Sequence, residues 1–210
     1  MTGKHAEQFH SLLPQIRNLG HLVANHTYNH PQLVELLAGG GDVIDQVART
    51  DAVLRPWIDG PTVFFRAPYG AWSNDIALAL NSNLAVSMGH VGPIQWDVYA
   101  GDTAHWLAGD SPQVAADAYL SAIQSVGRGI VLMHDSTSDT DVVKQLNLTC
   151  SMVQILVPAL KAQGYQFVRL DQVPDVVAAA QRPFVFALLA SNGKYVSAQG
   201  GGGGSILVNG

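Results

Sequence analysis

The stretch His21-Leu22-Val23-Ala24-Asn25-His26-Thr27-Tyr28-Asn29-His30-Pro31 places two histidines directly after a short apolar run. Residues 21–24 are expected to form a buried strand that delivers His26 and His30 from its C-terminal end. Two histidines four residues apart can project from one face of a helical turn and offer two neutral imidazoles to one metal ion. Taken alone, such a spacing more often marks two solvated or otherwise satisfied histidines, so its meaning depends on the rest of the chain.

Further polar residues come after later apolar runs. Arg66-Ala67-Pro68-Tyr69 comes directly after the β-branched and aromatic run at 62–65, and Leu132-Met133-His134-Asp135 ends another apolar run. Asp97 and Asp102 lie between them. Because α/β proteins build their active sites at the C-terminal ends of parallel strands, this serial order predicts one shared site.

Helical and strand patterns alternate along the chain. Helices are expected at 9–19 (ended by Gly20), 43–54, 73–80, 112–126 and about 152–164. Short strands are expected at 21–24, 62–65, 84–86, 93–96, 129–132 and 165–168. This alternation predicts an α/β fold with a parallel sheet covered by helices.

Composition limits the class of protein. The 210 residues are 48% hydrophobic and 13% charged, which is enough to bury one full core. The net charge of −5, with no sustained basic patch, argues against nucleic acid as a partner. No run approaches the roughly 18 apolar residues of a membrane span, and no signal peptide pattern is present. Cys150 is the single cysteine, and Asn147-Leu148-Thr149 matches a glycosylation acceptor.

The sequence changes character after about residue 182. Residues 184–189 and 195–197 flank Ser191-Asn192-Gly193-Lys194, which predicts a hairpin, and 206–208 is expected to begin another strand. The glycine run 200–204 is flexible by composition. We therefore expect a domain over 1–180 and the start of a truncated β module over 183–210, since so few residues do not make an independent β domain.

From about residue 2 to about 173, the chain resembles the polysaccharide deacetylases, the NodB-homology carbohydrate esterases. His26-Thr27-Tyr28-Asn29-His30 resembles their metal motif. Arg66-Ala67-Pro68-Tyr69 resembles their Arg-x-Pro-Tyr motif, and Leu132-Met133-His134 resembles their Leu-x-His motif. The resemblance implies an irregular (β/α) barrel, which agrees with the alternation of helix and strand patterns.

The resemblance also implies a reaction, the metal-dependent removal of N-acetyl groups from N-acetylglucosamine units of chitin, peptidoglycan or a related glycan. Such a hydrolysis needs an activated water, a stabilised oxyanion and a proton for the departing amine. His26 and His30 would be ligands of a divalent metal, expected to be zinc, with cobalt and nickel as alternatives. His134 would be the general acid, with Asp102 as the carboxylate that tunes its pKa.

Four further residues receive roles from the resemblance. Arg66 would position the catalytic base, and the backbone N–H of Tyr69 would help to stabilise the oxyanion. Leu132 would line the pocket for the acetyl methyl group. Trp106 is the candidate to replace an aromatic wall of the substrate site, although an aromatic residue in this context is more often part of a core.

Two departures from the family pattern matter. The family opens with a strand that carries an Asp-Asp pair, one residue acting as base and the other as metal ligand, and these 210 residues contain no such pair. The chain is therefore expected to begin inside the second strand, as a barrel lacking its first strand, and to be inactive as it stands. Of the family's Asp-x-x-Asp-Trp motif, Tyr99-Ala100-Gly101-Asp102-Thr103 keeps only the second aspartate.

Residues 186–198 loosely resemble the first hairpin of a fascin-like β-trefoil repeat. The parent protein is expected to be secreted or exposed at the cell surface, where it would meet an acetylated polysaccharide. Two other functions stay open. One is a non-catalytic glycan-binding remnant, and the other is a metal-dependent hydrolase of a non-glycan amide with the same ligands.

Overall fold

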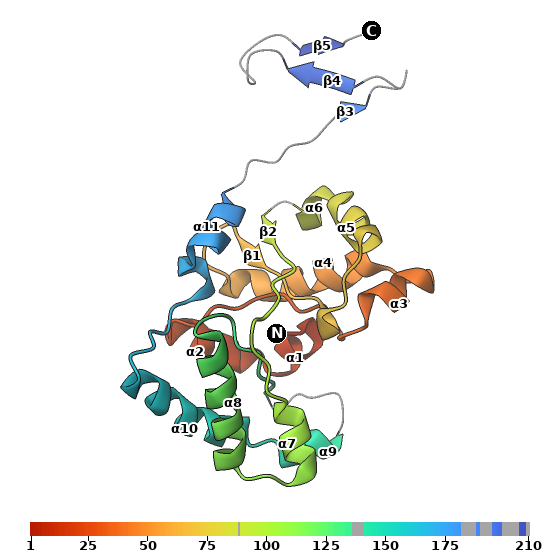
Figure 1. The fold of residues 1–210 in the computed structure, drawn as a ribbon. Coiled ribbons are helices and arrows are strands. Elements are labelled where there is room, and N and C mark those ends of the chain that lie inside the picture. Colours follow the sequence, from red (N-terminus) through yellow and green to blue (C-terminus); the bar gives the residue numbers. More distant parts are fainter. Residues whose placement is uncertain (88, 136–140, 182–187, 190–194, 199–205, 209–210) are drawn as a thin grey trace. The chain divides into compact units, whose positions relative to one another are not determined.

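The computed structural model describes residues 1–87, 89–135, 141–181, 188–189, 195–198 and 206–208. The chain divides into two compact units, Met1–Ala180 and Gln181–Gly210, and each is described here by itself. Figure 1 shows the first unit as a body rich in helices and the second as a group of short strands.

The first half of the first unit alternates helices with two short strands. Its elements are α1 (Gly3–Gln8), η1 (His10–Leu12), α2 (Leu13–Asn18), α3 (Leu33–Ala38), α4 (Val43–Leu54), η2 (Arg55–Trp57), β1 (Val63–Phe64), η3 (Pro68–Gly70), α5 (Asn74–Asn81), α6 (Leu84–Ser87) and β2 (His90–Val91). The second half is helical, with α7 (Asp102–Ala108), α8 (Pro112–Val126), α9 (Asp141–Leu146), α10 (Thr149–Ala162), η4 (Leu170–Gln172) and α11 (Pro174–Ala180).

All β pairing within the described part of this unit is parallel. β1 pairs with β2 in the register Val63↔His90 and Phe64↔Val91. Isolated parallel bridges join Asn25 to Phe65 and Val98 to Val131. These pairs bring the ends of several predicted strands together, as an α/β architecture requires, although the strands themselves are very short.

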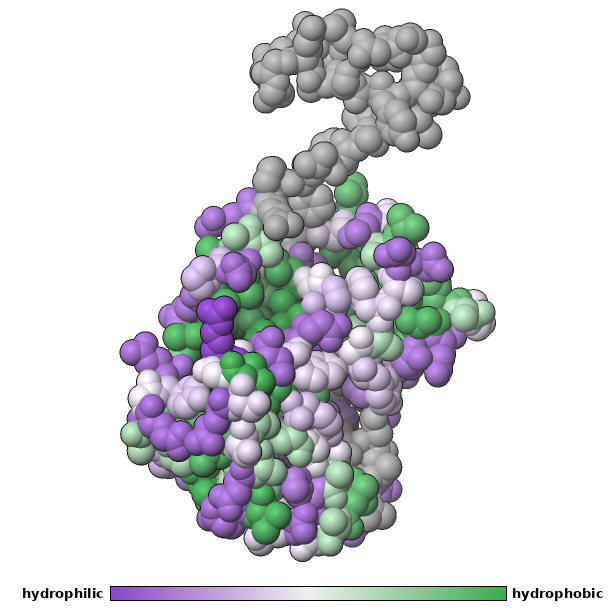
Figure 2. Space-filling view, viewed as in Figure 1, coloured by the Kyte–Doolittle hydropathy of each residue, from purple (hydrophilic) through white to green (hydrophobic). Residues whose placement is uncertain are grey.

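Three hydrophobic clusters hold the unit together. One lies among α7, α8 and α10 and contains Trp106, Tyr119, Met152 and Leu156. A second joins α3, α4 and α5 to the end of β1, and a third lies under α1 and α2. On the face drawn in Figure 2, hydrophilic and hydrophobic residues intermingle over the first unit.

Four predicted helices are confirmed, α4, α5, α8 and α10, although α10 begins at Thr149 and not near residue 152. The first turns of α5 and α8 explain why these two helices begin where they do. α4 has the predicted bounds, and α5 and α8 begin after the side-chain caps Ser73 and Ser111. Ser73 Oγ accepts from the Ile76 N–H and Ser111 Oγ from the Val114 N–H, both at 3.3 Å. Each cap satisfies a backbone donor that has no partner within the helix.

Several strand predictions are wrong. Residues 84–87 form helix α6 instead of a strand, and Asn83 Oδ1 accepts from the Ala85 N–H at 3.0 Å, as an N-cap does. Residues 21–24, 93–96 and 165–168 form no regular strand, and the pairing strand lies at His90–Val91 instead of 93–96. Of the strand predicted at 129–132, only the Val131 bridge is present.

The helix predicted at 9–19 forms as two shorter pieces, η1 and α2, and a separate helix, α1, precedes them. Phe9 leaves the helical conformation at φ −115° and ψ 35°, and α2 restarts with Pro14 in its first turn. Proline has no N–H to donate and is best tolerated in the first turn of a helix, which favours the start of a new helix there. Apolar spacing alone does not reveal this break.

Gly92 is required by close packing between β2 and the end of β1. A Cβ atom at this position would lie 2.5 Å from the backbone oxygen of Phe65. We expect Gly92→Ala to lower the free energy of unfolding by about 2 kcal/mol, because backbone must move to relieve the overlap. Thermal unfolding measures the effect. Gly39→Ala is the control, since its nearest added contact is 3.3 Å, and equal melting temperatures for the two variants would contradict this packing.

The second unit is a three-stranded antiparallel sheet in the order β3 (Leu188–Leu189), β4 (Tyr195–Ala198) and β5 (Ile206–Val208). Its register pairs Leu188 with Val196 and Ser197 with Leu207. The strands predicted on both sides of residues 191–194 are therefore present, as is the strand at 206–208. The turn at 191–194, the glycine run at 200–204 and residues 184–187 lie outside the described residues.

Candidate active site

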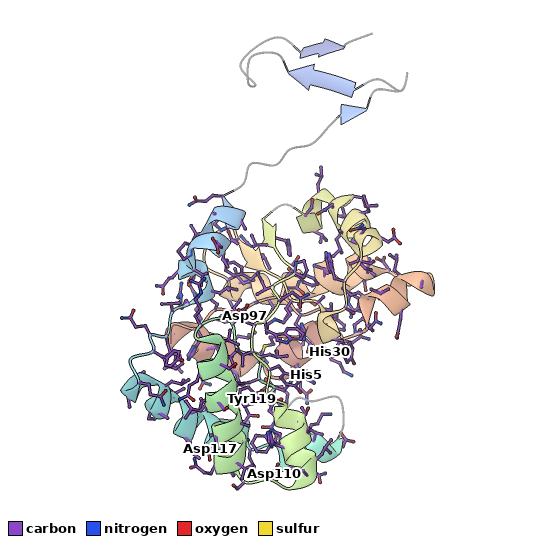
Figure 3. The ribbon with its side chains drawn as sticks, in the orientation of Figure 1. His5, His30, Asp97, Asp110, Asp117 and Tyr119 are labelled. Carbon is purple, nitrogen blue, oxygen red and sulfur yellow. The ribbon has the colours of Figure 1, made fainter. Side chains whose placement is uncertain are left out.

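The two histidines of the His26–His30 motif approach each other closely. His26 Nε2 and His30 Nε2 lie 3.0 Å apart, and the two rings meet edge to face. Their expected placement on a helical turn is wrong, because residues 26–30 form an irregular bend with positive φ at Thr27 and His30. Figure 3 labels His30, and the bend that carries it is joined to α1 by a hydrogen bond from the Gly3 N–H to the Thr27 oxygen at 3.0 Å.

Backbone strain occurs at this bend and at Tyr69, whose ring contacts that of His30. Among the described non-glycine residues, positive φ angles occur at Thr27, His30 and Tyr69 only. Asn25 Oδ1 accepts from the Thr27 N–H at 2.9 Å, and Thr27 Oγ1 accepts from the His30 N–H at 3.2 Å. Strained residues that surrounding hydrogen bonds hold in place are typical of functional sites.

His26 is prepared to act as a neutral ligand. Its Nδ1 lies 2.7 Å from the backbone oxygen of Arg66. A carbonyl oxygen can only accept, so Nδ1 carries the proton and the Nε2 lone pair faces His30. Burial is the main cause that lowers the pKa of His26 to about 4, which leaves the imidazole neutral at neutral pH.

Two zinc–nitrogen bonds of about 2.1 Å at a tetrahedral angle separate their nitrogens by about 3.4 Å. The observed 3.0 Å lies at the lower end of the range of about 3–4 Å that this geometry predicts, so the two imidazoles fit one ion after a small adjustment. Within the described residues, no third His, Cys, Asp or Glu is placed to complete a metal site. The metal itself stays a prediction.

Asp102 and His134 form a second polar pair, as expected from the sequence. His134 Nδ1 lies 2.9 Å from Asp102 Oδ1, and the His134 backbone N–H donates to Asp102 Oδ2. Asp102 is fully buried at the start of α7 and also accepts from the Thr103 N–H at 2.9 Å. The side chain of His134 is 41% exposed, so a buried carboxylate orients a histidine that solvent can reach.

The ionised state of Asp102 is stabilised despite its burial. Burial alone would raise its pKa, but hydrogen bonds from the side chain and the backbone of His134 outweigh that effect. The pKa of Asp102 therefore lies below its ordinary value of 3.8. At neutral pH the carboxylate is ionised, and it favours the tautomer of His134 that carries a proton on Nδ1.

Two residues that sequence reasoning missed hold the segment around His134. The buried hydroxyl of Tyr119 on α8 donates to the Leu132 oxygen at 2.9 Å (Figure 3). Asn147 Nδ2 donates to the His134 oxygen at 3.3 Å and to the Asp135 oxygen at 2.8 Å. The sequence marks Asn147 only as a glycosylation acceptor, and its engaged amide argues for a structural role instead.

Arg66 has backbone partners. Its Nε donates to the Ile94 oxygen at 3.0 Å, and its guanidinium carbon lies 5.9 Å from the centre of the Trp96 ring. The segment that carries these carbonyls is held beside β1, since the Ile94 N–H donates to Phe65 O at 2.8 Å. Backbone oxygens therefore hold the guanidinium of Arg66 in place, and its role in positioning a catalytic base stays a prediction.

Tyr69 lies next to the histidine pair. Its ring meets that of His30 edge to face at 4.8 Å between centroids, and 60% of the residue is exposed. Leu132 is half-buried and lies two residues before His134 in the sequence. Its role as lining of an acetyl pocket stays a prediction.

Two other predicted residues have structural roles. Trp106 is 1% exposed and donates from Nε1 to Thr149 Oγ1 at 3.2 Å, so the proposal that it forms a wall of the substrate site is wrong. Trp106 lies on the inner face of α7, in the hydrophobic cluster that α7 shares with α8 and α10. Asp97 Oδ2 accepts from the Ile130 N–H at 2.7 Å and so links the segments joined by the Val98–Val131 bridge.

The paired histidines and the segment after His134 face a common region. Asp135 lies close enough to the Met1 amino group to raise its pKa against the larger effect of burial, which lowers it to about 6. The same amino group and Arg66 both lie close enough to His26 to contribute to its lowered pKa. Parallel strand ends carrying paired imidazoles, an arginine and an oriented histidine define a site of the kind that hydrolases use.

Comparison with known proteins finds one group of enzymes that this chain resembles. The family model described as polysaccharide deacetylase matches residues 1–87. A peptidoglycan-N-acetylglucosamine deacetylase of Bacillus cereus is 27% identical over 176 residues, covering 82% of this chain. A chitooligosaccharide deacetylase of Azorhizobium caulinodans is 29% identical over 173 residues, covering 78% of this chain.

Solved structures agree with the sequence relatives. A crystal structure of a peptidoglycan N-acetylglucosamine deacetylase in complex with 4-naphthalen-1-yl-N-oxidanyl-benzamide has a TM-score of 0.59 and 27% identity, over 81% of this chain and 71% of that one. The chain is therefore similar to polysaccharide deacetylases in sequence and in fold. It spans 56% of the length of the Bacillus relative and 74% of the Azorhizobium relative.

No helix in the part of the chain that the structure describes is long and apolar enough to cross a membrane.

Proposed function

We propose that this domain takes part in the hydrolytic removal of N-acetyl groups from a glycan containing N-acetylglucosamine. One observation carries the proposal, the presence in one family fold of two facing imidazoles and a separate histidine oriented by a buried carboxylate. The first group suits a metal ion, and the second suits proton transfer. The relatives from Bacillus and Azorhizobium are named as deacetylases of peptidoglycan and chitooligosaccharides.

Each residue then receives a chemical role. His134 delivers a proton to the departing amine, and Asp102 keeps its ring oriented and stabilises the protonated form. The backbone N–H of Tyr69 contributes to binding of the oxyanion, and Leu132 lines the space for the acetyl methyl group. Arg66, held by the Ile94 oxygen, contributes positive charge next to the strand end.

His26 and His30 would hold the divalent ion, which we propose to be zinc, with cobalt or nickel as substitutes. When bound, such an ion supplies Lewis acidity for the acetyl carbonyl and lowers the pKa of water. The two histidines contribute neutral nitrogen ligands, since burial keeps His26 unprotonated at neutral pH.

Zinc binding can be tested on this chain directly. We expect His30→Ala to weaken zinc binding at least tenfold, because one of two nitrogen ligands is lost. Isothermal titration with zinc chloride at pH 7 measures the affinity, and His10→Ala, which removes an exposed histidine, is the control. Equal zinc affinities for the two variants would show that His26 and His30 do not form the metal site.

A non-catalytic glycan-binding role is the second candidate, and the missing third ligand within the described residues favours it. Binding of N-acetylglucosamine oligomers without acetate release, even after the missing carboxylates are supplied, would support that role. Acetate release from small amides but not from chitin oligomers would instead indicate a hydrolase of non-glycan amides. For the second unit we propose a β module of the β-trefoil type, and for the parent protein a location outside the cell, where acetylated polysaccharides occur.

A further inference from the structure

Helix α4 supports the bend at residues 26–30 with side-chain oxygens. Gln46 Oε1 accepts from the backbone N–H groups of Tyr28 and Asn29, both at 3.2 Å. The N–H of Thr27 depends on α4 less directly, through a buried amide side chain that α4 holds. Three consecutive N–H groups of the bend therefore rely on contacts with this helix.

The amide belongs to Asn25, which is fully buried and forms a parallel bridge with Phe65. Its Oδ1 accepts from the Thr27 N–H at 2.9 Å. Its Nδ2 donates to the Val47 backbone oxygen at 3.0 Å and to Asp51 Oδ1 at 2.7 Å. Every polar atom of this side chain therefore has a partner, and both acceptors of its Nδ2 lie on α4.

Asp51 fixes which way the Asn25 amide points. A carboxylate can only accept, so the amide nitrogen faces Asp51 and the amide oxygen is left for the Thr27 N–H. The reversed amide would place its oxygen against the carboxylate and its nitrogen against another donor. Thr27 has a φ of 65°, which is unfavourable for a β-branched residue, so its bond to Asn25 helps to hold this conformation.

A second contact keeps the Asp51 carboxylate in place. Its Oδ2 lies 3.0 Å from Nε2 of His90 on β2, and its side chain is only 19% exposed. Oδ2 therefore faces His90 while Oδ1 faces Asn25. A carboxylate engaged through both oxygens has little freedom to rotate, which suits it to fix the orientation of a neighbouring amide.

We propose that Asp51 is a positioning residue for the histidine pair of the candidate metal site. Its Oδ1 orients the Asn25 amide. That amide holds Thr27 in the conformation in which Thr27 Oγ1 accepts the His30 N–H at 3.2 Å. The facing arrangement of His26 and His30, with 3.0 Å between their Nε2 atoms, depends on these contacts. The inference rests on the metal site proposed above, because a divalent ion is what the pair would bind.

Amide hydrogen exchange tests these contacts without any metal. In the zinc-free chain at pH 7, followed by NMR, we expect Asp51→Ala to speed exchange of the Thr27 N–H about tenfold, because the amide that accepts from it loses its orientation. Asp51→Asn keeps an oxygen for Asn25, since the neutral ring of His90 can accept at Nε2 in its other tautomer. We therefore expect Asp51→Asn to exchange like the wild-type chain.

Zinc affinity is the second measurement. Partners that support metal ligands change metal affinity by about 10–100-fold, so we expect Asp51→Ala to weaken zinc binding about tenfold in isothermal titration and Asp51→Asn to preserve it. Asp45→Ala, which removes an exposed carboxylate from the same helix, is the control. Asp51→Leu fills the same space without an acceptor, is expected to match Asp51→Ala, and replaces it if Asp51→Ala does not fold.

A purely structural role of Asp51 would lower the melting temperature without changing either measurement on the folded chain. Unchanged Thr27 exchange in the variants without an acceptor would overturn the proposal, and so would faster exchange with wild-type zinc affinity. Asp51→Asn behaving like Asp51→Ala would also overturn it, because a hydrogen-bond acceptor is then not what Asp51 supplies. A wild-type chain that binds no zinc would contradict the metal site, and Thr27 exchange would then decide the role of Asp51 by itself.

Discussion

The 210-residue chain, purified and supplied with zinc, is expected to release no acetate above background from N-acetylglucosamine oligomers. Its sequence contains no Asp-Asp pair, and within the described residues no carboxylate joins His26 and His30. The family resemblance assigns the general base and one metal ligand to such a pair. A general base alone contributes about 10²–10⁴-fold in rate, so its loss takes turnover below detection. Enzymatic quantification of acetate measures the result.

The matching gain-of-function experiment uses a fusion. A strand and helix carrying Asp-Asp, taken from a polysaccharide deacetylase and joined ahead of Met1, are expected to raise acetate release at least a hundredfold. The same fusion with Asn-Asn in place of Asp-Asp is the control, because it keeps the packing and removes both carboxylates. Substantial activity from the unfused chain would show that other residues carry the chemistry.

The sequence predicted the helices of this fold better than its strands. The apolar stripes of α4 and α8 have helical period and clear caps at Asp42 and Ser111, so local chemistry fixes their limits. Short apolar runs such as 84–86 fit either a buried strand or a helix, and there the capping oxygen of Asn83 decides for a helix. Pairing partners far apart in sequence decide strand limits, which explains why the strand expected at 93–96 lies at β2 instead.

The residues of the candidate site could be predicted from the sequence, but the residues that hold them in place could not. His26, His30, Asp102 and His134 each come after an apolar run, and motif resemblance located all four. Tyr119 and Asn147 support the His134 segment through hydrogen bonds to backbone oxygens, which depend on packing and carry no sequence signature. Trp106 is a residue for which sequence position was misleading. It lies close to a motif in the sequence, but its side chain is buried in the core.

Asp102→Asn is expected to produce the largest loss of stability among single substitutions at the site. Asp102 is fully buried and accepts from the backbone N–H groups of Thr103 and His134 and from the His134 ring. An amide nitrogen in place of one carboxylate oxygen faces a donor, which leaves a buried N–H unsatisfied. We expect a loss of about 3 kcal/mol, or about 10 °C in melting temperature for a domain of this size.

The lowered pKa of Asp102 determines how its contribution to stability changes with pH. The pKa of Asp102 is lowered in the folded state, so its ionised form contributes stability that is fully present above the ordinary value of 3.8. That contribution is lost as the pH falls below 3.8 and through the lower folded-state pKa, where the wild-type side chain becomes neutral like asparagine. Thermal unfolding from pH 7 to pH 2.5 should therefore show the gap between wild type and Asp102→Asn closing at the acid end.

Two comparisons separate this effect from a general loss of charge. Asp117→Asn removes an exposed carboxylate from α8 and is expected to change the melting temperature by less than about 2 °C. In the fusion that carries Asp-Asp, Asp102→Asn should reduce turnover at least a hundredfold and leave the zinc content unchanged, because Asp102 orients His134 and does not bind the metal. Loss of zinc in that variant would instead make Asp102 a metal ligand. A stability gap that does not narrow between pH 7 and pH 2.5 would mean that the charge of Asp102 is not what stabilises the fold.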